Sequence, residues 1–204
     1  MDKIKLFKVN KKLLYCILIV TIVGVIAGSL FVTILKDVDK ASVTNSLESF
    51  ITEINNNEIN YGMSLKSSLI TNISLVLLIW LLGISIIGLP IIIFIYFIKA
   101  FSLGFTISSI LINFKLKGLI YAFIYIFPHN IINLFVYAIV SIYSIIYSFK
   151  LSNSFFNKAQ IDFKPIIEKN KYVLLISILV VLLTSLYGTY IMPYVFKIVL
   201  NLLK

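Results

Sequence analysis

Long apolar runs separated by polar stretches make up most of the chain. A helix needs about 20 apolar residues to cross a membrane, because it rises about 1.5 Å per residue through a hydrocarbon layer about 30 Å thick. The first run, residues 13–35, predicts a retained transmembrane helix, since the apolar region of a signal peptide is usually shorter. Residues 172–204 predict the last transmembrane helix and a short tail. The pattern is that of an all-α, polytopic membrane bundle with about five transmembrane helices.

Residues 67–149 predict the membrane core, with about three crossings. The stretch 67–114 contains a single charge and is too long for one crossing, but its length suits two. Gly88 and Pro90 interrupt it with residue types that favour turns. We therefore expect the turn between two crossings at these residues.

The third crossing of the core contains a helix breaker. Lys115 and Lys117 mark its start, and residues 118–149 then contain no Lys, Asp or Glu. As one helix this stretch would be about 48 Å long, which exceeds the hydrocarbon thickness. Pro128 removes a backbone donor and clashes with the preceding turn. The sequence predicts either a helix interrupted at Pro128 or a half-helix followed by a full crossing.

Residues 36–66 form the long polar segment between the first two crossings. Apolar residues recur within it at helical spacing, and they are Leu47, Phe50, Ile51 and Ile54. Asn45 is a candidate amino-terminal cap, and the asparagines at 55–57 are expected to end the helix. The segment predicts a short amphipathic helix whose apolar face lies on the membrane or binds a partner.

Charge suggests how the helices are oriented. The protein is 60% hydrophobic, has a mean hydropathy of +1.06 and carries a net charge of +10. The lysines lie in short clusters between apolar runs, which is typical of a multi-pass protein in the cell membrane and not of a nucleic-acid-binding protein. Residues 1–12 and 150–171 carry ten of the 18 lysines and predict a cytoplasmic amino terminus and a cytoplasmic loop. The loop 36–66 is then extracytoplasmic.

A few polar residues interrupt the apolar runs: Lys99, His129, Asn130 and Asn133. An intramembrane charge such as Lys99 is costly, so it either has a function or extends to the interface. A backbone carbonyl freed by Pro128 and a neutral His129 are its candidate partners. Asn130 and its neighbours either satisfy backbone groups at the Pro128 break or contact a proton or solute.

The sequence contains few residues of the types that catalyse reactions or bind metals. The chain has one histidine and one cysteine, Cys16, and its apolar runs contain no carboxylate. These residues cannot form a zinc site or an acid–base pair within the membrane. We therefore expect no enzyme activity, no metal and no cofactor.

Three stretches carry a resemblance to a known family. They are "LGISIIGLP", the spacing of Lys99, Gly104 and Phe105, and the turn from Pro128 to Asn130. With these features the chain resembles the stage II sporulation protein M family along nearly its whole length. In the wider family a glycine and an acid often stand where this chain has Asn130 and Asn133.

The resemblance implies a role that the residues alone do not reveal. It implies a non-catalytic scaffold in the mother-cell membrane at the sporulation septum of a spore-forming bacterium of the Firmicutes. The scaffold would recruit a peptidoglycan amidase/endopeptidase and a lytic transglycosylase during engulfment of the forespore. The alternative is a transporter or permease-like subunit that uses Lys99 and the kink from Pro128 to Asn130. The oligomeric state stays open, with a homo-oligomer as one alternative.

Overall fold

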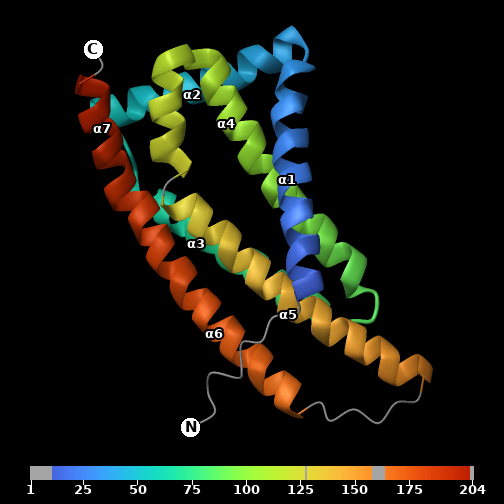
Figure 1. The fold of residues 1–204 in the computed structure, drawn as a ribbon. Coiled ribbons are helices and arrows are strands. Elements are labelled where there is room, and N and C mark those ends of the chain that lie inside the picture. The colour runs from blue at the N-terminus through green and yellow to red at the C-terminus, as the bar shows by residue number, and fades with distance from the viewer. Residues whose placement is uncertain (1–10, 127, 158–163, 203–204) are drawn as a thin grey trace.

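A computed structural model describes residues 11–126, 128–157 and 164–202, and the regular elements in these ranges are helical (Figure 1). Five helical stretches in these ranges are long and apolar enough to cross a membrane, which confirms the all-α polytopic bundle. In chain order the elements are α1 (Lys11–Thr33), α2 (Asp37–Asn56), α3 (Tyr61–Gly83), α4 (Gly88–Ile126), α5 (His129–Asn157), α6 (Lys164–Leu186), a π-helical segment (Tyr187–Ile191) and α7 (Met192–Leu202).

Helix α2 lies across one end of the bundle and joins α1 to α3 (Figure 1). It begins at Asp37, eight residues before the predicted cap, so the assignment of Asn45 as the cap is wrong. No glycine or proline interrupts residues 37–56, and the helix therefore continues through this polar stretch. It ends as predicted, with Asn57 in the left-handed conformation at φ 59°.

The turn between α3 and α4 lies at residues 84–87, so the prediction that Gly88 and Pro90 form it is wrong. Both residues lie in the first turn of α4, where Pro90 is tolerated because the first backbone N–H groups of a helix have no intrahelical acceptor. A Cβ atom on Gly88 would lie 1.7 Å from the carbonyl oxygen of Leu82. Gly88 therefore permits a close approach of the two helices and does not form the turn itself.

Helix α4 consists of two arms that meet at Lys115, whose φ of 50° and ψ of −125° are not helical. The first arm spans the bundle, and the second, residues 116–126, turns back beside it (Figure 1). The second arm is only about 16 Å long, too short to cross a membrane. It ends at Ile126, and α5 begins at His129. Of the two predicted alternatives, the structure contains the half-helix followed by a long helix.

The described parts of the predicted basic loop 150–171 are helical. Helix α5 extends to Asn157, because no glycine or proline interrupts it after the apolar run ends at residue 149. Helix α6 begins at Lys164. Pro165 lies in the first turn of α6, where a proline does not break a helix. The rest of this predicted loop, residues 158–163, lies outside the described residues, as does most of the predicted basic segment 1–12.

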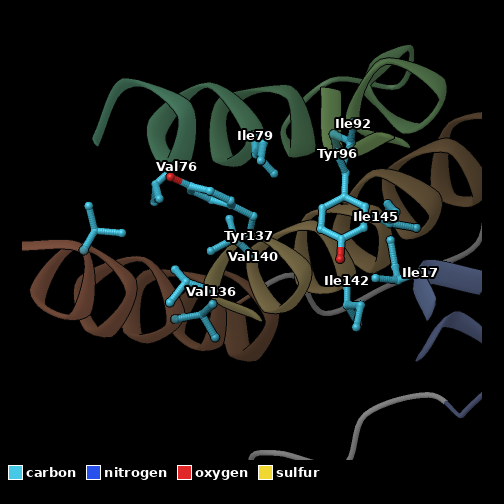
Figure 2. Close-up of a cluster of buried hydrophobic side chains, with 12 residues drawn as sticks. Ile17, Val76, Ile79, Ile92, Tyr96, Val136, Tyr137, Val140, Ile142 and Ile145 are labelled. Atoms are coloured by element: carbon cyan, nitrogen blue, oxygen red, sulfur yellow. The ribbon is translucent and has the colours of Figure 1, made fainter. Parts of the chain in front are cut away.

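The main core lies where α3, α5 and α6 pack together, with contributions from α1 and α4. Its buried side chains include Val76 and Ile79 of α3, Val140 of α5 and Val181 of α6. Figure 2 shows Tyr137 lying between α3 and α5 in this core. A second core cluster joins α2, α4 and α7, and its buried members are Ile54, Ile110, Tyr121, Ala122, Phe196 and Leu200.

Helices α1 and α4 pack with almost no space between their backbones. A Cβ atom on Gly28 would lie 2.0 Å from the carbonyl oxygen of Phe101, and one on Gly104 would lie 2.1 Å from that of Val25. Close approach through small residues is a general mode of helix association in membranes. It attaches the sparsely buried α1 to the bundle.

Candidate functional site

A small polar cavity of about 130 Å³ lies between α3, α4 and α5. It brings together three residues that the sequence singled out, Lys99, Asn130 and Asn133. Its other lining residues are Asn72, Ser102, Leu103, Thr106, Tyr125, Leu134 and Tyr137. Polar groups at membrane depth face other protein groups because lipid cannot satisfy them. This cavity is therefore the candidate site within the membrane core.

Lys99 contacts an aromatic ring in this cavity. Its Nζ lies 5.8 Å from the centre of the Tyr137 ring, a distance at which an ammonium group is attracted to the ring face. The predicted partner His129 is not among the residues that line the cavity. Its ring lies instead 6.2 Å from that of Tyr125 and 6.5 Å from that of Tyr187. Lys99 therefore lines the cavity, and His129 does not.

The Asn130 side chain satisfies a backbone group at the break between α4 and α5. Its Nδ2 donates a hydrogen bond of 2.9 Å to the carbonyl oxygen of Tyr125, near the end of α4. The carbonyl oxygen of Pro128 accepts a bond of 3.1 Å from the N–H of Ile132, which begins the hydrogen bonding of α5. This geometry matches the backbone-satisfying role that the sequence predicted for Asn130.

Replacing Asn130 with leucine is expected to destabilise the bundle by about 1–3 kcal/mol, because a partly buried carbonyl group at membrane depth loses its partner. The measurement is thermal unfolding of the purified protein in detergent. Asn55→Leu, on the exposed face of α2, is the matched control and should change stability by no more than about 0.5 kcal/mol. Equal unfolding temperatures for the two variants would contradict this role of Asn130.

Three further hydrogen bonds hold α3, α5 and α6 together, and the sequence analysis did not identify them. The hydroxyl of Tyr137 donates to Oδ1 of Asn72 at 2.7 Å, and Nδ2 of Asn72 donates to the hydroxyl of Ser185 at 3.4 Å. The Thr184 hydroxyl donates to Oδ1 of Asn133 at 2.5 Å. The sequence did contain one indication of these contacts. Ser68 and Asn72 are spaced i, i+4, which places two polar side chains on the same face of an apolar helix.

The four predicted partner-binding residues face the protein's own helices. Ile54 is only 2% exposed, and Leu47, Phe50 and Ile51 pack on the second core cluster. The Phe50 ring lies 6.1 Å from that of Phe196 on α7. The apolar face of α2 is therefore directed toward α4 and α7, and it is not a free surface on which a partner protein could dock.

Polar contacts hold α2 in its middle part and at its carboxyl-terminal end. The Thr44 hydroxyl donates to Oδ1 of Asn113 on α4 at 2.6 Å. Lys197 of α7 donates to Oδ1 of Asn57, the carboxyl-terminal cap of α2, also at 2.6 Å. Helix α2 is thus fixed on the bundle by its apolar face and by side-chain bonds in its middle part and at its carboxyl-terminal cap.

Side chains that could bind a metal ion do not cluster in the described residues. Within residues 11–126, 128–157 and 164–202, no group of three or more His, Cys, Asp or Glu side chains could hold a metal ion. Cys16 is exposed on α1. The described residues thus give no metal site on which a mechanism could be built.

Comparison with known protein families places most of the chain in one of them. A family model described as Stage II sporulation protein M matches residues 17–193, from within α1 to within α7. That range includes both the polar cavity and α2. No curated protein and no solved structure matches the chain.

Proposed function

Because this chain belongs to the stage II sporulation protein M family and is a multi-pass membrane protein, we propose that it is the non-catalytic scaffold of a sporulation engulfment complex. In this proposal it lies in the mother-cell membrane at the septum, with its amino terminus in the cytoplasm. It holds a peptidoglycan amidase/endopeptidase and a lytic transglycosylase beside the wall that they cut.

The observation that carries the proposal is the fixed position of α2 at one end of the bundle (Figure 1). A helix that is already ordered offers a partner a preformed surface and so lowers the entropic cost of binding. Because the apolar face of α2 is packed, its exposed face is the proposed contact surface. This surface carries the exposed acids Asp39, Glu48 and Glu53. Its charge favours a partner with a basic binding surface.

A double substitution, Glu48→Lys with Glu53→Lys, is expected to reduce co-purification of the two hydrolases from sporulating cells by about tenfold or more, because like charges then meet at the contact. Both side chains are exposed, so membrane insertion should be unchanged. Glu168→Lys, an exposed acid on the first turns of α6, is the matched control and should leave recruitment intact. Normal recruitment by the double variant at normal membrane levels would refute the proposed surface.

A solute pathway is the second candidate function, and the polar cavity around Lys99 favours it. The same co-purification assay distinguishes the two functions when Lys99→Met and His129→Ala are included. A scaffold should keep its partners and complete engulfment in both variants. Loss of engulfment in Lys99→Met, with partners still bound, would favour the solute pathway over the scaffold.

A further inference from the structure

A larger and mostly apolar cavity of about 460 Å³ lies beneath α2. Helix α2, both arms of α4 and Phe196 of α7 form its walls. Most of its lining is aliphatic or aromatic and includes Leu47, Phe50, Ile51, Phe105, Ile110 and Phe196. Its size and its mostly apolar lining are those of sites that bind small apolar or amphiphilic molecules.

The cavity lies at the depth of the last turns of α1. The Phe31 ring of α1 lies 6.3 Å from the ring of Phe105, which lines the cavity. The Ser29 hydroxyl also donates to the carbonyl oxygen of Gly104 at 3.3 Å. Since α1 crosses the membrane and ends at Thr33, the cavity lies in the leaflet next to α2, where acyl chains are the surrounding solvent.

One polar atom in the cavity wall lacks a partner. Ser109 is 1% exposed, and its hydroxyl has no hydrogen-bond partner. A serine in a membrane helix normally donates to the carbonyl group four residues earlier. The carbonyl oxygen of Ser109 itself accepts a bond of 2.8 Å from Asn113. An unpaired buried hydroxyl is costly, and a ligand oxygen in the cavity would satisfy it.

The edge of the cavity is polar but uncharged. Ser42 and Ser46 line both this cavity and an open hollow along α2. Asn45 and Ser49 add further polar groups to the hollow. An apolar interior beside a polar, uncharged rim is the arrangement that an amphiphilic molecule requires.

We propose that this cavity binds one acyl chain of a membrane glycerolipid, with an ester carbonyl oxygen of the lipid accepting a hydrogen bond from the Ser109 hydroxyl. An α-helix of a partner is a poorer fit, because a single turn about 10–12 Å wide and 5.4 Å long already occupies roughly 400–600 Å³. A lipid site beneath α2 goes beyond the proposed scaffold function. With a lipid bound in this cavity, the position of α2 on the bundle depends on the surrounding membrane.

The test uses the full chain in vesicles of phosphatidylglycerol and phosphatidylethanolamine. A trace of phosphatidylcholine carries a photoreactive diazirine on one ester-linked acyl chain. After irradiation, mass spectrometry of peptides should locate adducts at residues 42–51 and 105–121. Adducts on the exposed face of α1, which includes Ile19 and Ile22, measure contact with bulk lipid and serve as the internal reference.

Ser109→Ala is expected to lower the cavity adducts by about two- to tenfold relative to the α1 reference, as for the loss of one neutral hydrogen bond. Ser141→Ala is the matched control, because the hydroxyl of Ser141 is also buried and unpartnered but does not line this cavity. An ether-linked probe, which lacks the carbonyl group, should label the wild type as weakly as the ester probe labels Ser109→Ala.

Ser109→Phe should abolish the cavity adducts by filling the space, and Ile51→Trp fills it from α2 if the first variant does not fold. Adducts that stay at wild-type levels in a folded filling variant would overturn the lipid site, as would labelling confined to the outer surface. Equal labelling by the ester and ether probes would overturn the assignment of the carbonyl oxygen to Ser109. None of these outcomes depends on recruitment of a hydrolase.

Discussion

Gly28→Leu is expected to separate α1 from α4 and to lower the midpoint of thermal unfolding by roughly 5–10 °C, as for a cost of about 1–3 kcal/mol from overpacking. A Cβ atom at this position would lie 2.0 Å from the carbonyl oxygen of Phe101 and 2.8 Å from the backbone nitrogen of Phe105. Both atoms belong to the backbone of α4, so they cannot rotate away as a side chain could. Thermal unfolding in detergent is the measurement.

Gly62→Leu is the matched control for this experiment. Gly62 is exposed in the first turn of α3, and the nearest atom to its added Cβ would be Oδ1 of Asn60 at 3.7 Å. This variant should unfold at nearly the wild-type temperature. Gly104→Leu, which meets the carbonyl oxygen of Val25 across the same contact, should behave like Gly28→Leu. A wild-type midpoint for both contact variants would show that α1 does not depend on this close packing.

Ile54→Asp is expected to release α2 from the bundle. Ile54 is 2% exposed within the core cluster shared with α4 and α7. A carboxylate buried there without a partner costs several kcal/mol, more than the local packing of one helix can offset. Amide hydrogen exchange in residues 37–56 should become faster by about 100-fold, which corresponds to a loss of about 3 kcal/mol of local stability.

Asn55→Asp adds the same charge at the neighbouring exposed position and should leave exchange in α2 unchanged. Unchanged exchange in Ile54→Asp would mean that α2 does not depend on its apolar face for its position. The comparison also bears on the proposed function, because a charge at Phe50 or Ile54 would disturb folding before it disturbed partner binding. Exposed acids such as Glu48 are therefore the informative positions for tests of recruitment.

Much of the fold could be predicted because a membrane crossing is a local property of the chain. The length and hydropathy of each run predicted about five crossings, and the part of the chain that the structure describes contains five suitable spans. The helices are interrupted at Lys115 and near Pro128, as the sequence predicted. A charged side chain and a missing backbone donor both affect the helix at their own position, so these interruptions could be read from local sequence. The turn at Gly88 and Pro90 was misplaced because both residues are also compatible with the first turn of a helix.

The candidate site could be predicted only in part. A lysine or asparagine in an apolar run stands out in the sequence, and Lys99, Asn130 and Asn133 do line one cavity. Asn72 and Tyr137 were missed, because their importance comes from a contact between residues 65 positions apart. The periodicity of α2 revealed an apolar face but not the helices that cover it.

By itself the sequence determined which segments are membrane helices and that the chain is interrupted near Lys115 and Pro128. The physical reason is that a helix in lipid satisfies its own backbone hydrogen bonds, so its existence depends on its own residues. Only the tertiary structure decided which helices are neighbours, that the face of α2 is covered, and that Ser109 faces a cavity. These features depend on close approach and on a few side-chain bonds between distant segments, and no local pattern encodes them.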